Sequence, residues 1–225
     1  MSRVRETIHR TALLAALASV AITGCIFSPK EDVLPPPPPI VINSEGALID
    51  ALEQAYQTRN FTNFVKLLAN DPDRNAEYLF LLSEPAEGDI TQWGFQTEAR
   101  VHRRMFEPQN TTPGELPVPN DLWLQSVDIN LTPQAEFSER TNLYSMDGGA
   151  DGKLDPRIWR ATSARYSTDV FFTMQGELDF QVQGQADFVV IEDLTKTDGA
   201  AGQFLLLIWE DLGTPAKPGV AADPT

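Results

Sequence analysis

The two residues best suited to acid–base chemistry are Glu98 and His102. They lie four residues apart in a segment, about 94–107, whose apolar residues recur with helical spacing, so both side chains share one face of a helix. A carboxylate in that position can orient an imidazole and hold its pKa near neutrality for general acid–base catalysis. The alternative is a core histidine with a hydrogen-bond partner. In that case we expect His102→Leu to be neutral or mildly stabilising.

An acidic loop offers a second kind of chemistry. Asp147, Asp151 and Asp155 stand at relative positions 1, 5 and 9 of a stretch that resembles part of a calcium-binding loop. Ile158 stands where such loops place a bidentate glutamate, so the alternative is a plain surface turn. These three aspartates are the candidate metal ligands, and we expect no cofactor.

Composition limits what else the chain can do. The 225 residues include one cysteine and two histidines, which excludes disulfide bonds within the chain and a Cys/His zinc site. A formal charge of −15 predicts repulsion from phosphate backbones, so no nucleic acid is expected as a partner. The 42% hydrophobic residues are enough for a packed core.

Residues 1–24 are typical of a signal peptide, with three arginines before a short apolar run. The run ends in Ile22-Thr23-Gly24-Cys25, which resembles the lipobox of bacterial lipoproteins. That resemblance implies cleavage before Cys25, a lipid on its sulfur, and anchoring of the protein in the cell envelope. Because residue 26 is Ile and not Asp, the resemblance also implies the outer membrane. The alternative is a free or core cysteine after an ordinary export signal.

Residues 25–43 form the predicted tether between the lipidated cysteine and the body of the chain. Five consecutive prolines, 35–39, favour a polyproline II rod of about 3.1 Å per residue, hence a spacer of roughly 15 Å. A docking motif for a proline-binding partner is the alternative. Residues 212–225, rich in proline, alanine and glycine, are expected to be a disordered tail.

The body contains patterns for helices first and strands later. Ser44 and Asn60 are expected to cap two helices, and the third helix is the one at about 94–107. Strands are predicted over 77–82, 123–131, 166–174, 178–191 and 203–211. The long connection 132–160 is expected to hold a short helix or an excursion from the fold.

The strand at 178–191 is the expected centre of the sheet. Its residues alternate from Phe180 to Val190, which predicts one buried and one solvated face, and it pairs with 166–174 as a hairpin. Gly184 lies on the predicted buried face, where a strand glycine often marks a bend or a close approach of backbone.

This order of elements resembles the nuclear transport factor 2-like family over about residues 44–211. The resemblance also rests on Trp93-Gly94 before the third helix, Met105-Phe106 at its end, and Trp209-Glu210-Asp211 in the last strand. It implies an α+β fold in which a curved antiparallel sheet wraps around three N-terminal helices and leaves a pocket at the open end. The family includes isomerases and cyclases as well as proteins without catalytic activity.

We expect such a pocket to be lined by side chains from the elements that converge on the interior, namely Trp93, His102, Phe106, Trp123, Phe171, Phe180 and Trp209. The leading interpretation is a lipid-anchored envelope protein whose non-catalytic binding or interaction domain holds a small apolar ligand. Two alternatives stay open: an isomerase- or hydrolase-like enzyme that uses Glu98 and His102, and a structural envelope protein that forms homodimers.

Overall fold

The computed structural model describes residues 41–86, 89–110, 114–146, 152–176, 179–197, 200 and 202–213. The predicted signal peptide, Cys25, all but the last three residues of the tether, Asp147, Asp151 and the predicted tail beyond Gly213 lie outside these residues. The chain divides into two units, 1–39 and 40–225, and every helix and strand of the described residues belongs to the second. No helix in the described ranges has both the length and the apolar character needed to cross a membrane.

The described part of the second unit contains three α-helices, nine strands and three short 3-10 helices. In chain order they are α2 (Glu45–Gln57), α3 (Phe61–Leu67), β1 (Asn70–Asp71), η1 (Pro72–Arg74), β2 (Ala76–Glu77), β3 (Leu79–Ala86), β4 (Ile90–Gly94), α4 (Phe95–Phe106), η2 (Asn120–Leu122), β5 (Leu124–Pro133), β6 (Ser138–Glu139), η3 (Thr141–Leu143), β7 (Trp159–Met174), β8 (Asp179–Asp193) and β9 (Phe204–Gly213).

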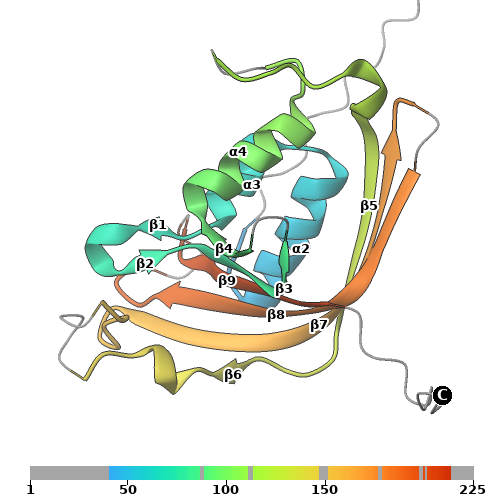
Figure 1. The fold of residues 1–225 in the computed structure, drawn as a ribbon. Coiled ribbons are helices and arrows are strands. Elements are labelled where there is room, and N and C mark those ends of the chain that lie inside the picture. The colour runs from blue at the N-terminus through green and yellow to red at the C-terminus, as the bar shows by residue number, and fades with distance from the viewer. Residues whose placement is uncertain are drawn as a thin grey trace, which may run out of the picture. The chain divides into compact units, whose positions relative to one another are not determined.

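The predicted helix starts are confirmed by their caps. The side chain of Ser44 accepts a hydrogen bond from the Ala47 amide at 3.1 Å and so begins α2. Asn60 does the same for α3 with the Asn63 amide at 2.9 Å. The third helix, α4, also lies where the periodicity placed it. Figure 1 shows α2, α3 and α4 together on the inner side of a curved sheet, so the predicted α+β class is confirmed.

The main sheet has seven strands in the order β4-β3-β9-β8-β7-β5, with β6 paired to β7 (Figure 1). One pair departs from the expected antiparallel arrangement: β3 runs parallel to β9, with Leu79 opposite Ile208 and Leu82 opposite Asp211. β3 is antiparallel to β4, and β9 is antiparallel to β8. Where these two pairs meet, β3 and β9 lie side by side and run in the same direction. The sheet is therefore mixed.

The sheet separates two hydrophobic cores. The larger lies between its inner face and the helices, and includes Leu52, Phe64, Phe188 and Trp209. A smaller core lies on the opposite face at one end of β7, β8 and β9, because successive strand residues point to opposite faces. Its buried members are Ala69, Ala76, Leu154, Trp159, Ala161, Val189, Ile191 and Leu207. The long connection 132–160, which contains β6 and η3, supplies part of this second core.

The other end of the β7–β8 hairpin is less covered than the alternation predicted. On the inner face of β8, burial begins at Ala186, while Phe180 and Val182 are 48% and 55% exposed. The prediction of a buried face is therefore wrong for this end, because the core that packs under β8 does not extend so far. The interpretation of Gly184 as a close approach of backbone is confirmed, since a Cβ atom there would lie 2.9 Å from the Gly213 carbonyl oxygen.

Candidate functional site

The helix α4 brings Glu98 and His102 together as predicted, but it buries both. Glu98 is 2% exposed and His102 is 5% exposed. The His102 Nδ1 atom lies 3.1 Å from the Glu98 carbonyl oxygen and 3.3 Å from Glu98 Oε1. The Trp93 Nε1–H donates to Glu98 Oε2. The pair is thus part of a hydrogen-bonded network inside the larger core.

A residue from another helix completes this network. The hydroxyl group of Tyr56, on α2, lies 2.5 Å from His102 Nε2. A neutral imidazole has one donor and one acceptor nitrogen, so a proton on Nδ1 faces the Glu98 carbonyl oxygen while Nε2 accepts from Tyr56. Both ring nitrogens then have partners without any ligand. This satisfied arrangement is what the structural interpretation of His102 requires.

Aromatic rings enclose the imidazole. The Phe64 ring stacks on it with centroids 3.9 Å apart, and the rings of Tyr56 and Phe106 meet it edge to face at 5.2 and 5.4 Å. These contacts keep water away from His102. An acid–base catalyst must reach its substrate, and in this conformation the imidazole reaches none.

The enclosure shifts the pKa values of Glu98 and His102 in the directions that favour the uncharged form of each side chain. Burial raises the pKa of Glu98 to about 7, opposed by the hydrogen bond from Trp93 and by the Tyr78 hydroxyl group. Burial lowers the pKa of His102 to about 4, opposed by its hydrogen bond to the Glu98 backbone. The Tyr78 hydroxyl is near enough to Glu98 to affect its pKa, although it makes no hydrogen bond of ordinary geometry.

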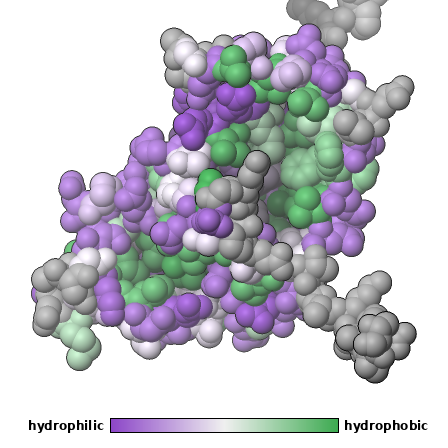
Figure 2. All heavy atoms as spheres, viewed as in Figure 1, coloured by the Kyte–Doolittle hydropathy of each residue, from purple (hydrophilic) through white to green (hydrophobic). Residues whose placement is uncertain are grey.

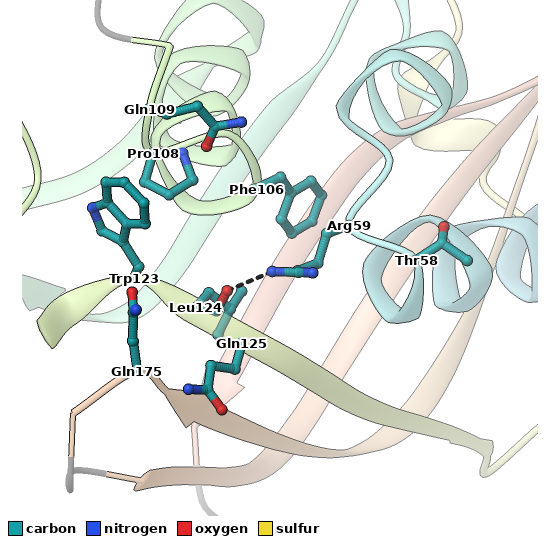
Figure 3. Close-up of a pocket in the computed structure, with 9 residues that line it drawn as sticks. All are labelled: Thr58, Arg59, Phe106, Pro108, Gln109, Trp123, Leu124, Gln125 and Gln175. Atoms are coloured by element: carbon teal, nitrogen blue, oxygen red, sulfur yellow. Dashed lines mark hydrogen bonds between the residues drawn. The ribbon is translucent and has the colours of Figure 1, made fainter. Parts of the chain in front are cut away.

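A separate cavity of about 510 Å³ opens beside this network. Figure 3 shows its walls: the end of α2, the end of α4, the start of β5 and the end of β7 converge on it. Its lining residues are Thr58, Arg59, Phe106, Pro108, Gln109, Trp123, Leu124, Gln125 and Gln175. Phe106, Pro108 and Leu124 are buried and Trp123 is half-buried, while the polar lining residues are exposed. The cavity thus has an apolar floor and a polar rim.

Phe106 is the residue shared by the cavity and the buried network. It lines the cavity, and the same ring packs against His102 and Tyr56. Neither Glu98 nor His102 lines the cavity. Among the described lining residues Arg59 carries the one ionisable side chain.

Two of the seven residues expected at a pocket, Phe106 and Trp123, line this cavity. Trp93 stacks on Phe80 with ring centroids 4.4 Å apart, and Trp209 packs in the larger core. Phe171, on the outer face of β7, and Phe180 are exposed. His102 is enclosed as described above.

Figure 2 shows hydrophobic surface gathered beside β5 and the far end of the β7–β8 hairpin, on the side that faces the helices. The exposed side chains of Phe180 and Val182 belong to this end of β8. They form an apolar surface on the inner face of the sheet, distinct from the nine residues that line the cavity.

The remaining candidate ligand of the acidic loop is already paired. Both carboxylate oxygens of Asp155 accept hydrogen bonds from the Arg157 guanidinium, at 2.5–3.1 Å. Hydrogen bonds from Arg157 hold the pKa of Asp155 below its usual value. Within the described ranges no group of three or more His, Cys, Asp or Glu side chains is placed to hold a metal ion. Asp147 and Asp151 lie outside those ranges.

Sequence patterns missed most of the cavity, and above all Arg59. Arg59 lies in the three-residue connection Thr58-Arg59-Asn60 between two correctly predicted helices. The one sequence signal was a charged residue directly before the N-cap of a helix, and such a signal has no periodicity that would mark a ligand site. The three glutamines come from three different segments, and no local pattern brings them together.

No family model matches this sequence, and no curated protein is detectably similar to it. Several solved structures are similar in fold. A nuclear transport factor 2-like protein from Streptomyces avermitilis is 10% identical with a TM-score of 0.45, over 76% of this chain and 94% of that one. A nuclear transport factor 2-like superfamily protein from Salmonella enterica is 13% identical with a TM-score of 0.43, over 79% and 92%.

Naphthalene 1,2-dioxygenase, solved with indole in its active site, is 11% identical with a TM-score of 0.44, over 76% of this chain and 77% of that one. Two of these three proteins carry the name of the family that the order of elements resembles. At such identities and TM-scores, no activity or ligand is transferred from any of them to this chain.

Proposed function

We propose that this protein is a lipid-anchored envelope protein whose domain binds a small molecule in the cavity between α2, α4 and β5 and does not transform it. The binding proposal rests on the separation of the acid–base pair from the cavity. The acid–base pair Glu98–His102 is enclosed and satisfied, whereas the cavity is lined by apolar and amide side chains and one arginine. Such a lining can orient a ligand but holds no group suited to proton transfer near neutral pH.

The anchor proposal rests on the sequence of residues 1–25. The lipobox resemblance implies a diacylglycerol on the Cys25 sulfur and an acyl chain on its new amino group. These three acyl chains would hold the protein firmly at a bilayer, and an acidic body gains no other attraction to an anionic surface. The proline-rich tether would then keep the cavity clear of the headgroups.

Replacing Cys25 by serine tests the anchor. We expect the Cys25→Ser chain to move from the membrane fraction to the soluble envelope fraction, because the lipid has no attachment atom. The wild-type chain with Ser28→Cys is the matched control, since a cysteine outside the motif should leave it in the membrane. If Cys25→Ser remains in the membrane fraction, the anchor proposal is wrong.

A structural, dimer-forming role is a second candidate. It is supported by the exposed Phe180 and Val182, which would gain from burial against a second copy. Sedimentation of the soluble Cys25→Ser chain measures this directly, and a monomer at micromolar concentration excludes it.

A further inference from the structure

Arg59 stands in a backbone position that glycine normally occupies. Its φ is +50°, in the left-handed region. The Asn60 amide donates to the Ala55 carbonyl oxygen at 2.8 Å, and the Arg59 amide to that of Tyr56 at 2.9 Å. These are the two hydrogen bonds of a Schellman motif, with Arg59 at its left-handed residue. A glycine would close α2 there without steric strain, so the backbone alone gives no reason for an arginine.

The side chain of Arg59 supplies a reason. Its Nη1 atom donates to the Leu124 carbonyl oxygen at 2.5 Å, which holds the guanidinium against the cavity wall (Figure 3). This is the one hydrogen bond of that guanidinium within the described residues, although the group has five N–H donors. The other donors remain for a ligand.

The charge of Arg59 is also uncompensated in the described part of the chain, where no carboxylate lies within ion-pair distance of it. Five other arginines do have such a partner, at 2.5–3.8 Å: Arg74, Arg104, Arg157, Arg160 and Arg165. Arg100, Arg103 and Arg140 have none within the described ranges either, but they do not line the cavity. In a protein with 32 acidic and 17 basic residues, an arginine without a carboxylate at a cavity is a specific attraction for an anion.

The opposite wall of the cavity suits a flat apolar body. The Trp123 Nε1–H already donates to the Val118 carbonyl oxygen at 2.9 Å, so the indole offers its apolar surface. Pro108 lies beside it and Phe106 between it and Arg59 in Figure 3. Trp123 comes directly before Leu124, the first residue of β5, so adjacent backbone positions hold both the indole and the guanidinium.

We propose that the cavity binds a small planar carboxylate, whose oxyanion pairs with Arg59 and whose ring lies against Trp123, Pro108 and Phe106. This inference rests on the proposed binding function and names its ligand class. The amide groups of Gln109, Gln125 and Gln175 form the rim and can hydrogen-bond further polar substituents. A volume of about 510 Å³ is within the usual range for small-molecule sites.

Calorimetric titration of the full chain with 2-naphthoate and with neutral, nearly isosteric 2-naphthamide tests the proposal. We expect the carboxylate to bind about tenfold or more tightly than the amide, because a hydrogen bond to a charged group is the stronger one. In Arg59→Gly the two probes should bind equally, at the affinity of the amide. That variant should melt no lower than about the wild-type temperature, since glycine relieves the left-handed strain as it removes the bond to Leu124.

Three outcomes separate the two proposals. Equal affinity of both probes for the wild-type chain, with loss of both in Trp123→Ala, overturns the carboxylate inference and leaves the binding function standing. A preference for the carboxylate that survives in Arg59→Gly likewise overturns the role of Arg59. Binding of neither probe to the wild-type chain overturns both proposals.

Discussion

The buried network around His102 and the cavity around Arg59 are neighbours that share the ring of Phe106, yet their properties are opposite. The first holds a carboxylate, an imidazole and a phenol in hydrogen-bond contact, but all three side chains are buried. The second is open, but within the described residues its lining carries one ionisable side chain, that of Arg59. The residues suited to acid–base chemistry lie in the buried network, whereas the space open to a ligand lies in the cavity beside it.

This difference shows that residue types at a suitable spacing do not make a site. Glu98 and His102 have the spacing of a catalytic pair, and their enclosure turns them into a structural network. Arg59 has no spacing pattern at all, and its exposure at a cavity with unused donors makes it the better candidate for ligand contact.

Removing the ring of Phe106, which separates the buried network from the cavity, should have the largest effect. We expect Phe106→Ala to lower the free energy of unfolding by about 3–5 kcal/mol, because it empties space in the larger core. It should also open His102 to the cavity, so the pKa of His102 should rise from about 4 towards 6.5. Urea unfolding and an NMR titration of the His102 ring measure the two effects.

Phe106→Leu is the matched control, since it keeps a bulky apolar side chain in the wall. It should cost less than the alanine variant and leave the pKa of His102 low. A pKa near 6.5 in Phe106→Leu, or near 4 in Phe106→Ala, would show that Phe106 is not what separates the two regions.

The pH dependence of stability should sharpen the comparison next. Glu98 has a raised pKa, so its contribution is full below pH 4.5 and is lost as the pH rises to about 7. His102 has a lowered pKa, so its contribution is full above pH 6.5 and is lost as the pH falls to about 4. The two slopes have opposite signs between pH 4.5 and 6.5, so their sum in the wild-type chain should be nearly flat there.

In Glu98→Gln, the pH dependence of stability that comes from His102 should become visible. The glutamine can still accept from Trp93, but it does not titrate. Relative to the wild-type chain, we expect this variant to lose stability as the pH falls from 6.5 towards 4.5, by roughly 3 kcal/mol in all. Chemical denaturation at half-unit intervals of pH measures it. Parallel pH profiles for the two chains would contradict the shifted pKa values.

Replacing His102 by leucine should have the smallest of these effects, about 1–3 kcal/mol of destabilisation at pH 8, because it leaves the Tyr56 hydroxyl buried without a partner. This revises the expectation of a neutral or mildly stabilising change, which did not include Tyr56. Urea unfolding of His102→Leu alone and with Tyr56→Phe measures the cost. The double variant should recover part of it, and a His102→Leu chain as stable as wild type would mean that the hydrogen bond contributes nothing.

Local patterns predicted the helices and most strands well, because each depends on residues close in sequence. Ser44 and Asn60 mark helix starts by side-chain chemistry within three residues, and the alternation in β8 gave its face assignments. The parallel β3–β9 pair was missed because nothing near Leu79 indicates which distant strand lies beside it. The second core was missed although the run from Phe188 to Ile191 signals burial on both faces.

The candidate site was harder to predict, since burial and cavities depend on how elements meet. The helical spacing of Glu98 and His102 was correct, but the tyrosine that completes their network comes from α2, 46 positions earlier than His102. The left-handed conformation of Arg59 appears only when α2 ends and the next residue, Asn60, caps α3. Such features follow from tertiary geometry and leave no periodic trace.

The parallel pairing of β3 with β9 has a consequence for the order of folding. Leu68 also bridges to Leu206, so the early part of the domain is held at two points by its last strand. Contacts between segments so distant along the chain are slow to form. A growing polypeptide that has not yet reached Phe204 has an open edge on β3, the kind of unpaired strand that associates with other chains. Completion of the domain must therefore wait until β9 has been synthesised.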